Sequence, residues 1–436
     1  MRDEERRSVA AVFAAHGASS GTFASRLPWL SDHLHLSAGK LGIALLMTSI
    51  GAICAMPFAG RLVARLGTKT VARVLICVFA LVVLAASWMP SLLTLAAATT
   101  VLGAAGGTSD MAMNAQGILV EKRMGRSIMS GLHGSWSTGV LIAALAGSLA
   151  AHQHVSARVH FAVAAVVIAA LTLWATHAFR TSASDVGLAE EKTADVPLFV
   201  LPRGVILLIG LVGFCGIYAE VAAQDWSSVY MHRTLHGDEA EAAFTTGMFA
   251  FTMAAGRLSG DAVVGRLGAA LTVRVCGVLG ALGGVLVVVA QSPAPAIVGF
   301  MLIGIGVSVV VPLAFAAAGH AGPNPTLGVA GVATIAYGAG MAAPGMIGGI
   351  ANLTSLRVAF TAVAVLAGLV ALGGGLLGRN APVAGLGVAA GAGSAGAGLG
   401  SGAVGPVGPG ATGGRVDVEA VGLGVAAEAE ALANEG

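Results

Sequence analysis

The sequence predicts an all-α integral membrane protein in which twelve transmembrane helices form two pseudo-symmetric six-helix bundles. Three observations lead to this prediction. Of the 436 residues, 56% are hydrophobic and 10% are charged, whereas soluble domains carry about 25% charged residues. Apolar runs of membrane-spanning length recur along the chain, and a motif of the first half returns in the second half.

The apolar runs set the expected number of helices, because a helix that crosses the bilayer core needs ~20 apolar residues. Connections are short except around 180–203 and 227–243. The N-terminus is basic and then apolar, but no small-residue cleavage site precedes Arg26, so we expect a retained helix rather than a signal peptide. Twelve runs meet the length: 9–31, 40–60, 71–89, 92–118, 129–151, 159–179, 204–225, 243–262, 271–290, 294–318, 327–350 and 355–378.

The charges predict the orientation. Loops rich in Lys and Arg stay in the cytoplasm. With the N-terminus inside, most of the 23 Lys and Arg residues fall in loops on the cytoplasmic side. We therefore expect a multi-pass protein of the cytoplasmic (inner) membrane with both termini in the cytoplasm.

Composition divides the chain into four parts. We expect an N-terminal six-helix bundle over 1–180, a cytoplasmic linker over 181–202 and a C-terminal six-helix bundle over 203–380. The last part, 381–436, is rich in Gly and Ala, and such a segment buries too little apolar surface to order itself. We expect it to be a disordered cytoplasmic tail.

An internal repeat supports the two bundles. The string "RLGTKTVARV" (65–74) returns as "RLGAALTVRV" (266–275), and "GRL" stands before each copy. Each copy follows the second span of its half. Parallel six-span repeats are the architecture of a large class of secondary transporters.

These loops carry a resemblance to a known family. "GRLVARLGTK" resembles the signature between helices two and three of the major facilitator superfamily, although Ala64 stands where the family usually has Asp. The resemblance implies that the acidic residue of the second copy, Asp261, latches the cytoplasmic helix ends. The alternative role of the arginines is to anchor the topology of the chain. The signature residues that we expect to act in gating are Gly60, Arg61, Arg65, Gly67, Gly256, Arg257, Asp261 and Arg266.

A narrower resemblance covers nearly all of 1–380. The strings "SRLPWLSDHLHLS", "SDMAMNAQGILVEKRMGRSIMSGLHGSWSTG" and "GFCGIYAEVAAQDWSSVYM" together look like the MosC-like/YbjJ branch of that superfamily. The branch implies the fold of the superfamily and transport by alternating access. It inclines the expected substrate towards small polar solutes such as sugars or polyols.

Asp110 is the leading functional candidate. It lies twelve residues before Lys122, which places it about 18 Å from the cytoplasmic charges and near the membrane midplane. Asn114, one turn later, shares its helix face, and we expect it to contact the solute; a bond to a neighbouring helix is the alternative. Carboxylates within a membrane cost on the order of 3 kcal/mol and usually face a cavity or a partner. We expect Asp110 to bind and release protons during transport; the alternative is a structural hydrogen bond to His133 or Ser135.

Further candidates for solute binding or proton coupling lie in other spans. We expect Arg26 of the first span to pair with Glu220 or Asp225 of the seventh span across the outer mouth. Plain snorkelling of these side chains to the interface is the alternative. The other candidates are His133 and Trp136 in the fifth span, Trp226 in the seventh and Tyr337 in the eleventh.

The sequence lacks a phosphate-binding loop, a zinc-protease motif and a serine nucleophile motif. We therefore expect no enzyme activity, no cofactor and no metal. The small net charge of +2 gives no footprint for nucleic acid. The prediction is a monomeric secondary active transporter in the lipid bilayer, coupled to protons. Alternatives are drug or metabolite efflux by proton antiport and a transporter-like sensor that does not transport.

Overall fold

The computed structural model describes residues 2–125, 128–179, 202–321 and 325–379. Within these ranges the regular elements are helices and no strand occurs, which confirms the all-α prediction. The predicted tail and, apart from residue 202, the predicted linker lie outside the described residues.

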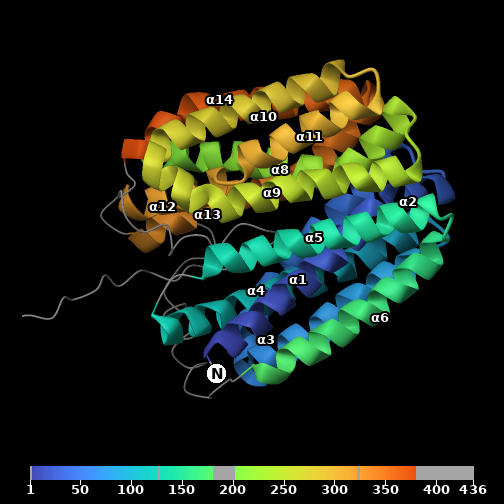
Figure 1. Ribbon diagram of the computed structural model, residues 1–436, viewed down its shortest axis with the longest axis horizontal. Coiled ribbons are helices and arrows are strands. Elements are labelled where there is room, and N and C mark those ends of the chain that lie inside the picture. Colours follow the sequence, from blue (N-terminus) through green and yellow to red (C-terminus); the bar gives the residue numbers. More distant parts are fainter. Residues whose placement is uncertain (1, 126–127, 180–201, 322–324, 380–436) are drawn as a thin grey trace, which may run out of the picture. The chain divides into compact units, whose positions relative to one another are not determined.

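The first half of the chain forms helices α1 to α6, coloured from blue to green in Figure 1. A break at Arg26 separates α1 from α2, because Arg26 has non-helical backbone angles and Pro28 stands in the first turn of α2. Its elements are α1 (Arg2–Ser25), α2 (Leu27–His33), α3 (Ala38–Ala86), α4 (Leu92–Met124), α5 (Met129–His152), α6 (Ala157–Ala175) and the short 3-10 helix η1 (Thr176–Ala178).

The second half supplies the other six spans. Its helices are α8 (Val205–Leu235), α9 (Glu239–Leu267), α10 (Ala269–Val289), α11 (Pro293–Val307), α12 (Val310–His320), α13 (Pro325–Leu353) and α14 (Leu356–Arg379). In the described part of the chain, nine helical segments are long and apolar enough to cross a membrane. The more polar α1 and α9 are not among them, and α3 contains two of the predicted spans.

Two glycines give the repeats the same backbone turn. Gly67 divides α3 with φ 79° and ψ 154°, and Gly268 separates α9 from α10 with φ 77° and ψ 156°. Both occupy the Gly of the repeated "RLG" string. Because a side chain would be strained at such positive φ angles, glycine at these sites lets each half turn back after its second span.

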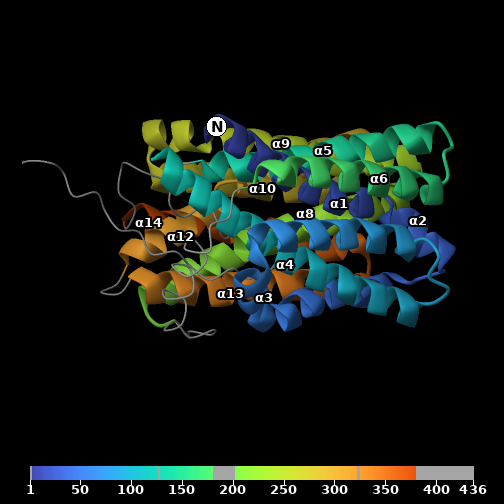
Figure 2. The ribbon, with the colours of Figure 1, turned by 90° about the horizontal axis from the view of Figure 1, so that it is seen from below.

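Helices within and between the halves approach closely. A Cβ atom at Gly103 of α4 would overlap the Thr48 carbonyl oxygen of α3, and one at Gly51 would overlap the Thr100 carbonyl oxygen. Close approach at small residues is the usual way in which membrane helices pack. Between the halves, α5 packs against α9 (Figure 1) and α3 against α13, which Figure 2 shows from below.

We predict that Gly103→Ala destabilises the protein by about 1–3 kcal/mol, the usual cost of overpacking, because its Cβ would meet backbone. The measurement is the thermal unfolding midpoint in detergent. Gly368→Ala in α14 is the matched control, since open space surrounds that position. Equal midpoints for the two variants would contradict this account of the α3–α4 contact.

Candidate functional site

A cavity of about 190 Å³ lies between the two halves of the described chain. Helices α1, α3, α4 and α5 of the first half and α8 and α13 of the second half line it. Its volume is below the ~300–1,000 Å³ of sites for drug-sized ligands. The cavity therefore fits a small solute.

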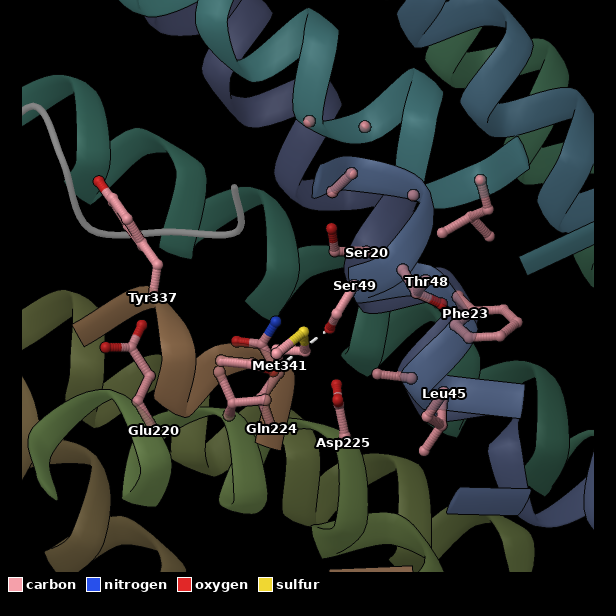
Figure 3. A pocket seen from close by; sticks show the side chains of 18 of the residues that line it. Ser20, Phe23, Leu45, Thr48, Ser49, Glu220, Gln224, Asp225, Tyr337 and Met341 are labelled. Carbon is pink, nitrogen blue, oxygen red and sulfur yellow. Dashed lines mark hydrogen bonds between the residues drawn. The ribbon is translucent and has the colours of Figure 1, made fainter. Parts of the chain in front are cut away.

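The wall of the cavity combines polar and apolar side chains (Figure 3). Ser49 Oγ of α3 donates a hydrogen bond to the Gly340 carbonyl oxygen of α13 (3.3 Å), which links the two halves at the wall. Thr48 Oγ1 has no hydrogen-bond partner among the described residues. The other labelled polar side chains are Ser20, Glu220, Gln224, Asp225 and Tyr337, and the labelled apolar ones are Phe23, Leu45 and Met341.

A hydrogen-bond chain fixes one side of the cavity. The Trp136 indole Nε1–H of α5 donates to His16 Nδ1 of α1 (3.0 Å). His16 Nε2–H donates in turn to the Gly106 carbonyl oxygen of α4 (3.1 Å). An indole N–H only donates and a carbonyl oxygen only accepts, so these contacts require the neutral Nε2–H tautomer. This arrangement holds Trp136 and His16 in the cavity wall.

Glu220 reaches the cavity from α8 and is paired with Arg257 of α9. Arg257 donates to Glu220 Oε1 (2.7 Å) and to Ser137 Oγ of α5 (3.1 Å). The side chains of the pair are only 7% and 8% exposed. The ion pair neutralises Glu220, and the bond to Ser137 connects the second half to the first.

The expected pairing of Arg26 with Glu220 or Asp225 is wrong. Arg26, at the break between α1 and α2, forms an ion pair with Glu239 in the first turn of α9. It also donates to His160 Nδ1 (3.4 Å) and to the Val155 carbonyl oxygen (3.3 Å). The break carries Arg26 to the end of the helices. Glu220 lies deeper and has Arg257 as a neighbour.

A second set of contacts joins the halves near α2, at what we call the α2 end. His232 of α8 lies between Asp32 Oδ2 (2.8 Å) and the Gly237 carbonyl oxygen (2.9 Å). Arg233 donates to Ser31 Oγ and to the Leu36 carbonyl oxygen (2.7 Å). Together with the Arg26–Glu239 pair, these contacts close the α2 end.

Asp110 is buried in α4, one turn beyond the cavity-lining Gly106 and Gly107. Its Oδ1 atom has no hydrogen-bond partner among the described residues. Asn114 Nδ2 donates to the Asp110 backbone oxygen (2.9 Å). Tyr337, in the cavity wall, lies close enough to Asp110 for an electrostatic interaction. Asp110 thus lies behind the wall of the cavity.

Asp110 forms no hydrogen bond to His133 or Ser135, the structural alternative that the sequence left open. His133 does not bond to Asp110; its ring packs edge-on against Phe13 (5.4 Å between centroids), and its Nε2 has no partner in the described part of the chain. Ser135 Oγ donates to the Gly131 carbonyl oxygen of its own helix (3.0 Å). His133 therefore lies in the packed interior and outside the cavity lining.

Asp225 and Trp226 are neighbours in α8 with different surroundings. Asp225 lines the cavity, and no hydrogen bond or ion pair joins its carboxylate to another described residue. Trp226 is completely buried in the hydrophobic core and does not line the cavity. The sequence placed both residues at the same site, whereas the structure keeps only Asp225 there.

The signature-loop residues do not line the cavity, although Arg257 pairs with the cavity-lining Glu220. Gly256 packs against Ser308, and Gly60 lies near Met111. Asp261 is exposed and pairs with no described residue, so the predicted latch is not formed here. The other exposed members are Arg61, Arg65 and Arg266.

Several cavity residues were missed from the sequence: Ser20, Thr48, Ser49 and Gln224. Their signal was present, because each is a polar residue inside an apolar run, but serine and threonine often bond to their own helix. No group of three His, Cys, Asp or Glu side chains in the described ranges could hold a metal ion.

A helical membrane chain with repeated halves and a central cavity lined by apolar and polar side chains has the features of a multi-span solute transporter. The chain belongs to the Major Facilitator Superfamily, whose family model matches residues 9–349. This confirms the resemblance read from the signature loops.

Known relatives support the same conclusion. The chain is 34% identical over 367 residues to the uncharacterized transporter y4wD of Sinorhizobium fredii (strain NBRC 101917 / NGR234), covering 84% of this chain and 96% of the relative. An uncharacterized MFS-type transporter of Yersinia pestis is 36% identical, with 81% and 91% covered. The membrane protein MosC of Rhizobium meliloti is 27% identical, with 80% and 84% covered. The family and these relatives confirm the MosC-like branch and a transporter rather than an enzyme.

Solved structures share the fold. The nucleoside transporter NupG superposes with a TM-score of 0.65 at 14% identity, covering 86% of this chain and 98% of the other. The fucose:proton symporter FucP of E. coli superposes with a TM-score of 0.55 at 14% identity, covering 85% and 98%. These likenesses confirm the predicted fold.

The buried pair yields a test by a double-mutant cycle. Breaking a buried ion pair from one side typically costs about 3–5 kcal/mol, whereas replacing both partners by apolar residues is often neutral. We therefore expect Arg257→Met and Glu220→Leu each to lower the thermal midpoint strongly, and the double variant to lower it less than either. Arg266→Met, at an exposed site, serves as the control. Additive losses would show that the two side chains do not depend on each other.

Proposed function

We propose that the protein is a secondary active transporter that moves a small polar solute, such as a sugar or polyol, across the cytoplasmic membrane by alternating access. The observation that carries this proposal is the small cavity between the halves, with hydroxyl, amide and carboxylate groups in its wall. Alternating access in this architecture moves one six-helix bundle against the other around a fixed site. The bundles are 1–180 and 203–380, and the working unit is a monomer.

Protons are the proposed coupling ion, and Asp110 is the proposed carrier. A buried carboxyl group is favoured in its protonated form and can exchange a proton when its surroundings change. Asp110 has an unpartnered oxygen atom and an electrostatic neighbour, Tyr337, across the interface between the halves. Rearrangement of that interface would alter the surroundings of Asp110. The printed name of FucP, a fucose:proton symporter, makes the proton the first ion to test.

We predict that Asp110→Asn abolishes coupling. Purified protein is reconstituted in liposomes that contain a pH dye, and sugars, polyols, amino acids and cationic drugs are added. The wild type should move protons with at least one compound, and the variant should do so at least ten times more slowly because an amide does not release a proton. The control is Glu4→Gln, an acid exposed at the start of α1. Equal proton movement in wild type and Asp110→Asn would remove Asp110 from the mechanism.

The proposed orientation places both chain termini in the cytoplasm and the α2 end outside. The excess of Lys and Arg in the loops at the opposite end supports it. We predict that alkaline phosphatase fused after His236, between α8 and α9, is active because it reaches the periplasm. The same enzyme fused after Gly268, between α9 and α10, should be inactive. The reverse pattern would invert the proposed orientation.

A further inference from the structure

The charges around the cavity are unbalanced. Two carboxylates line it, those of Glu220 and Asp225, and no Lys or Arg of the described residues does. The nearby arginines are already engaged: Arg257 pairs with Glu220, and Arg26 pairs with Glu239. The contacts of His16 hold that ring in its neutral tautomer. Asp225 therefore faces the cavity without a counter-charge.

An unpaired carboxylate in a low-dielectric cavity is unfavourable, and a cation beside it offsets that cost. Asp225 extends from α8 towards Ser49 and Thr48 of α3 (Figure 3). Thr48 Oγ1 has no partner among the described residues and can accept a hydrogen bond. One carboxylate and neighbouring hydroxyl oxygens form an acceptor set that suits an ammonium group.

The remaining wall is suited to the body of such a solute. Phe23 and Phe79 line the cavity, and aromatic faces attract cations as well as apolar groups. Asp225 would repel an anion, and no cationic side chain in the lining would offset that repulsion. Such repulsion is one way in which a site rejects the wrong ligand. The lining thus favours cations over anions.

We propose that the cavity binds a positively charged small solute, a protonated amine, and that the Asp225 carboxylate is its counter-ion. This rests on the proposed function in taking the cavity as the solute site, and it replaces the neutral sugar or polyol named there by a cationic solute. Glu220 has a different role, because Arg257 has already neutralised it. Asp110 is also separate, since it lies behind the wall.

The test measures the charge preference of the cavity directly. Thr48→Cys places a thiol in the wall and removes a hydroxyl that bonds to no described residue. Its reaction rates are measured with a cationic reagent, trimethylammonioethyl methanethiosulfonate, and an anionic one, sulfonatoethyl methanethiosulfonate. The ratio of the rates is divided by that for free cysteine. Labelling of the parent chain, which has four cysteines of its own, is subtracted.

We expect the normalised ratio to favour the cation at least tenfold, within the range by which charged clefts concentrate counter-ions. Asp225→Asn in the Thr48→Cys chain should bring the ratio close to one. Glu4→Gln, which removes an acid outside the cavity, should leave it unchanged. A ratio near one with Asp225 intact, or a ratio that Asp225→Asn does not alter, would overturn the proposal.

These outcomes are independent of transport. The labelling ratio reports the cavity charge even if the liposome assay detects no transport, in which case only the proposed function fails. If the assay does identify a transported compound, we expect it to carry a positive charge and to bind at least tenfold more weakly to Asp225→Asn. A neutral or anionic compound that binds equally well to both would overturn the charge assignment and leave transport established.

Discussion

The buried ion pair between Arg257 and Glu220 sets the balance of charge around the central cavity. Charged groups survive in an apolar interior when they are paired and hydrogen-bonded. Arg257 pairs with Glu220 and also donates to Ser137, so its positive charge is already balanced. Asp225 is left as the unpaired charge of the lining. Without the pair, Glu220 would add a second negative charge to the wall, or Arg257 would be free to attract anions.

Small residues allow the helices of the first half to pack closely. Glycine at positions 51 and 103 brings α3 and α4 into backbone contact, and Gly17 and Gly139 do the same for α1 and α5. Tight packing within the first half leaves the space between the halves for the cavity. Between the halves, α5 packs against α9 and α3 against α13, and the bond from Ser49 to Gly340 crosses the interface beside the cavity.

Hydropathy and charge predicted the helices well, because the length of an apolar run is a direct consequence of bilayer thickness. The repeat also predicted that Gly67 and Gly268 are equivalent, and both have the same positive φ. The partners of charged residues could not be predicted in this way. The sequence led to an expected pair of Arg26 with Glu220 or Asp225, but Arg26, at the break after α1, pairs with Glu239. Such contacts depend on how helices rotate and bend, which spacing alone does not encode.

The two groups of ion pairs differ in how easily they can separate. At the α2 end, Asp32 is 54% exposed, so water can replace its partners when the halves part, whereas Arg26 is only 1% exposed beside Glu239. Exposed pairs contribute little stability for this reason. The Arg257–Glu220 pair is buried, and separating it would leave an uncompensated charge. Among the contacts at the α2 end, those of Asp32 are therefore the least costly to separate. The inner pair joins α9 to α8 within one half, so it can stay intact while Arg257 exchanges its bond to Ser137 across the interface.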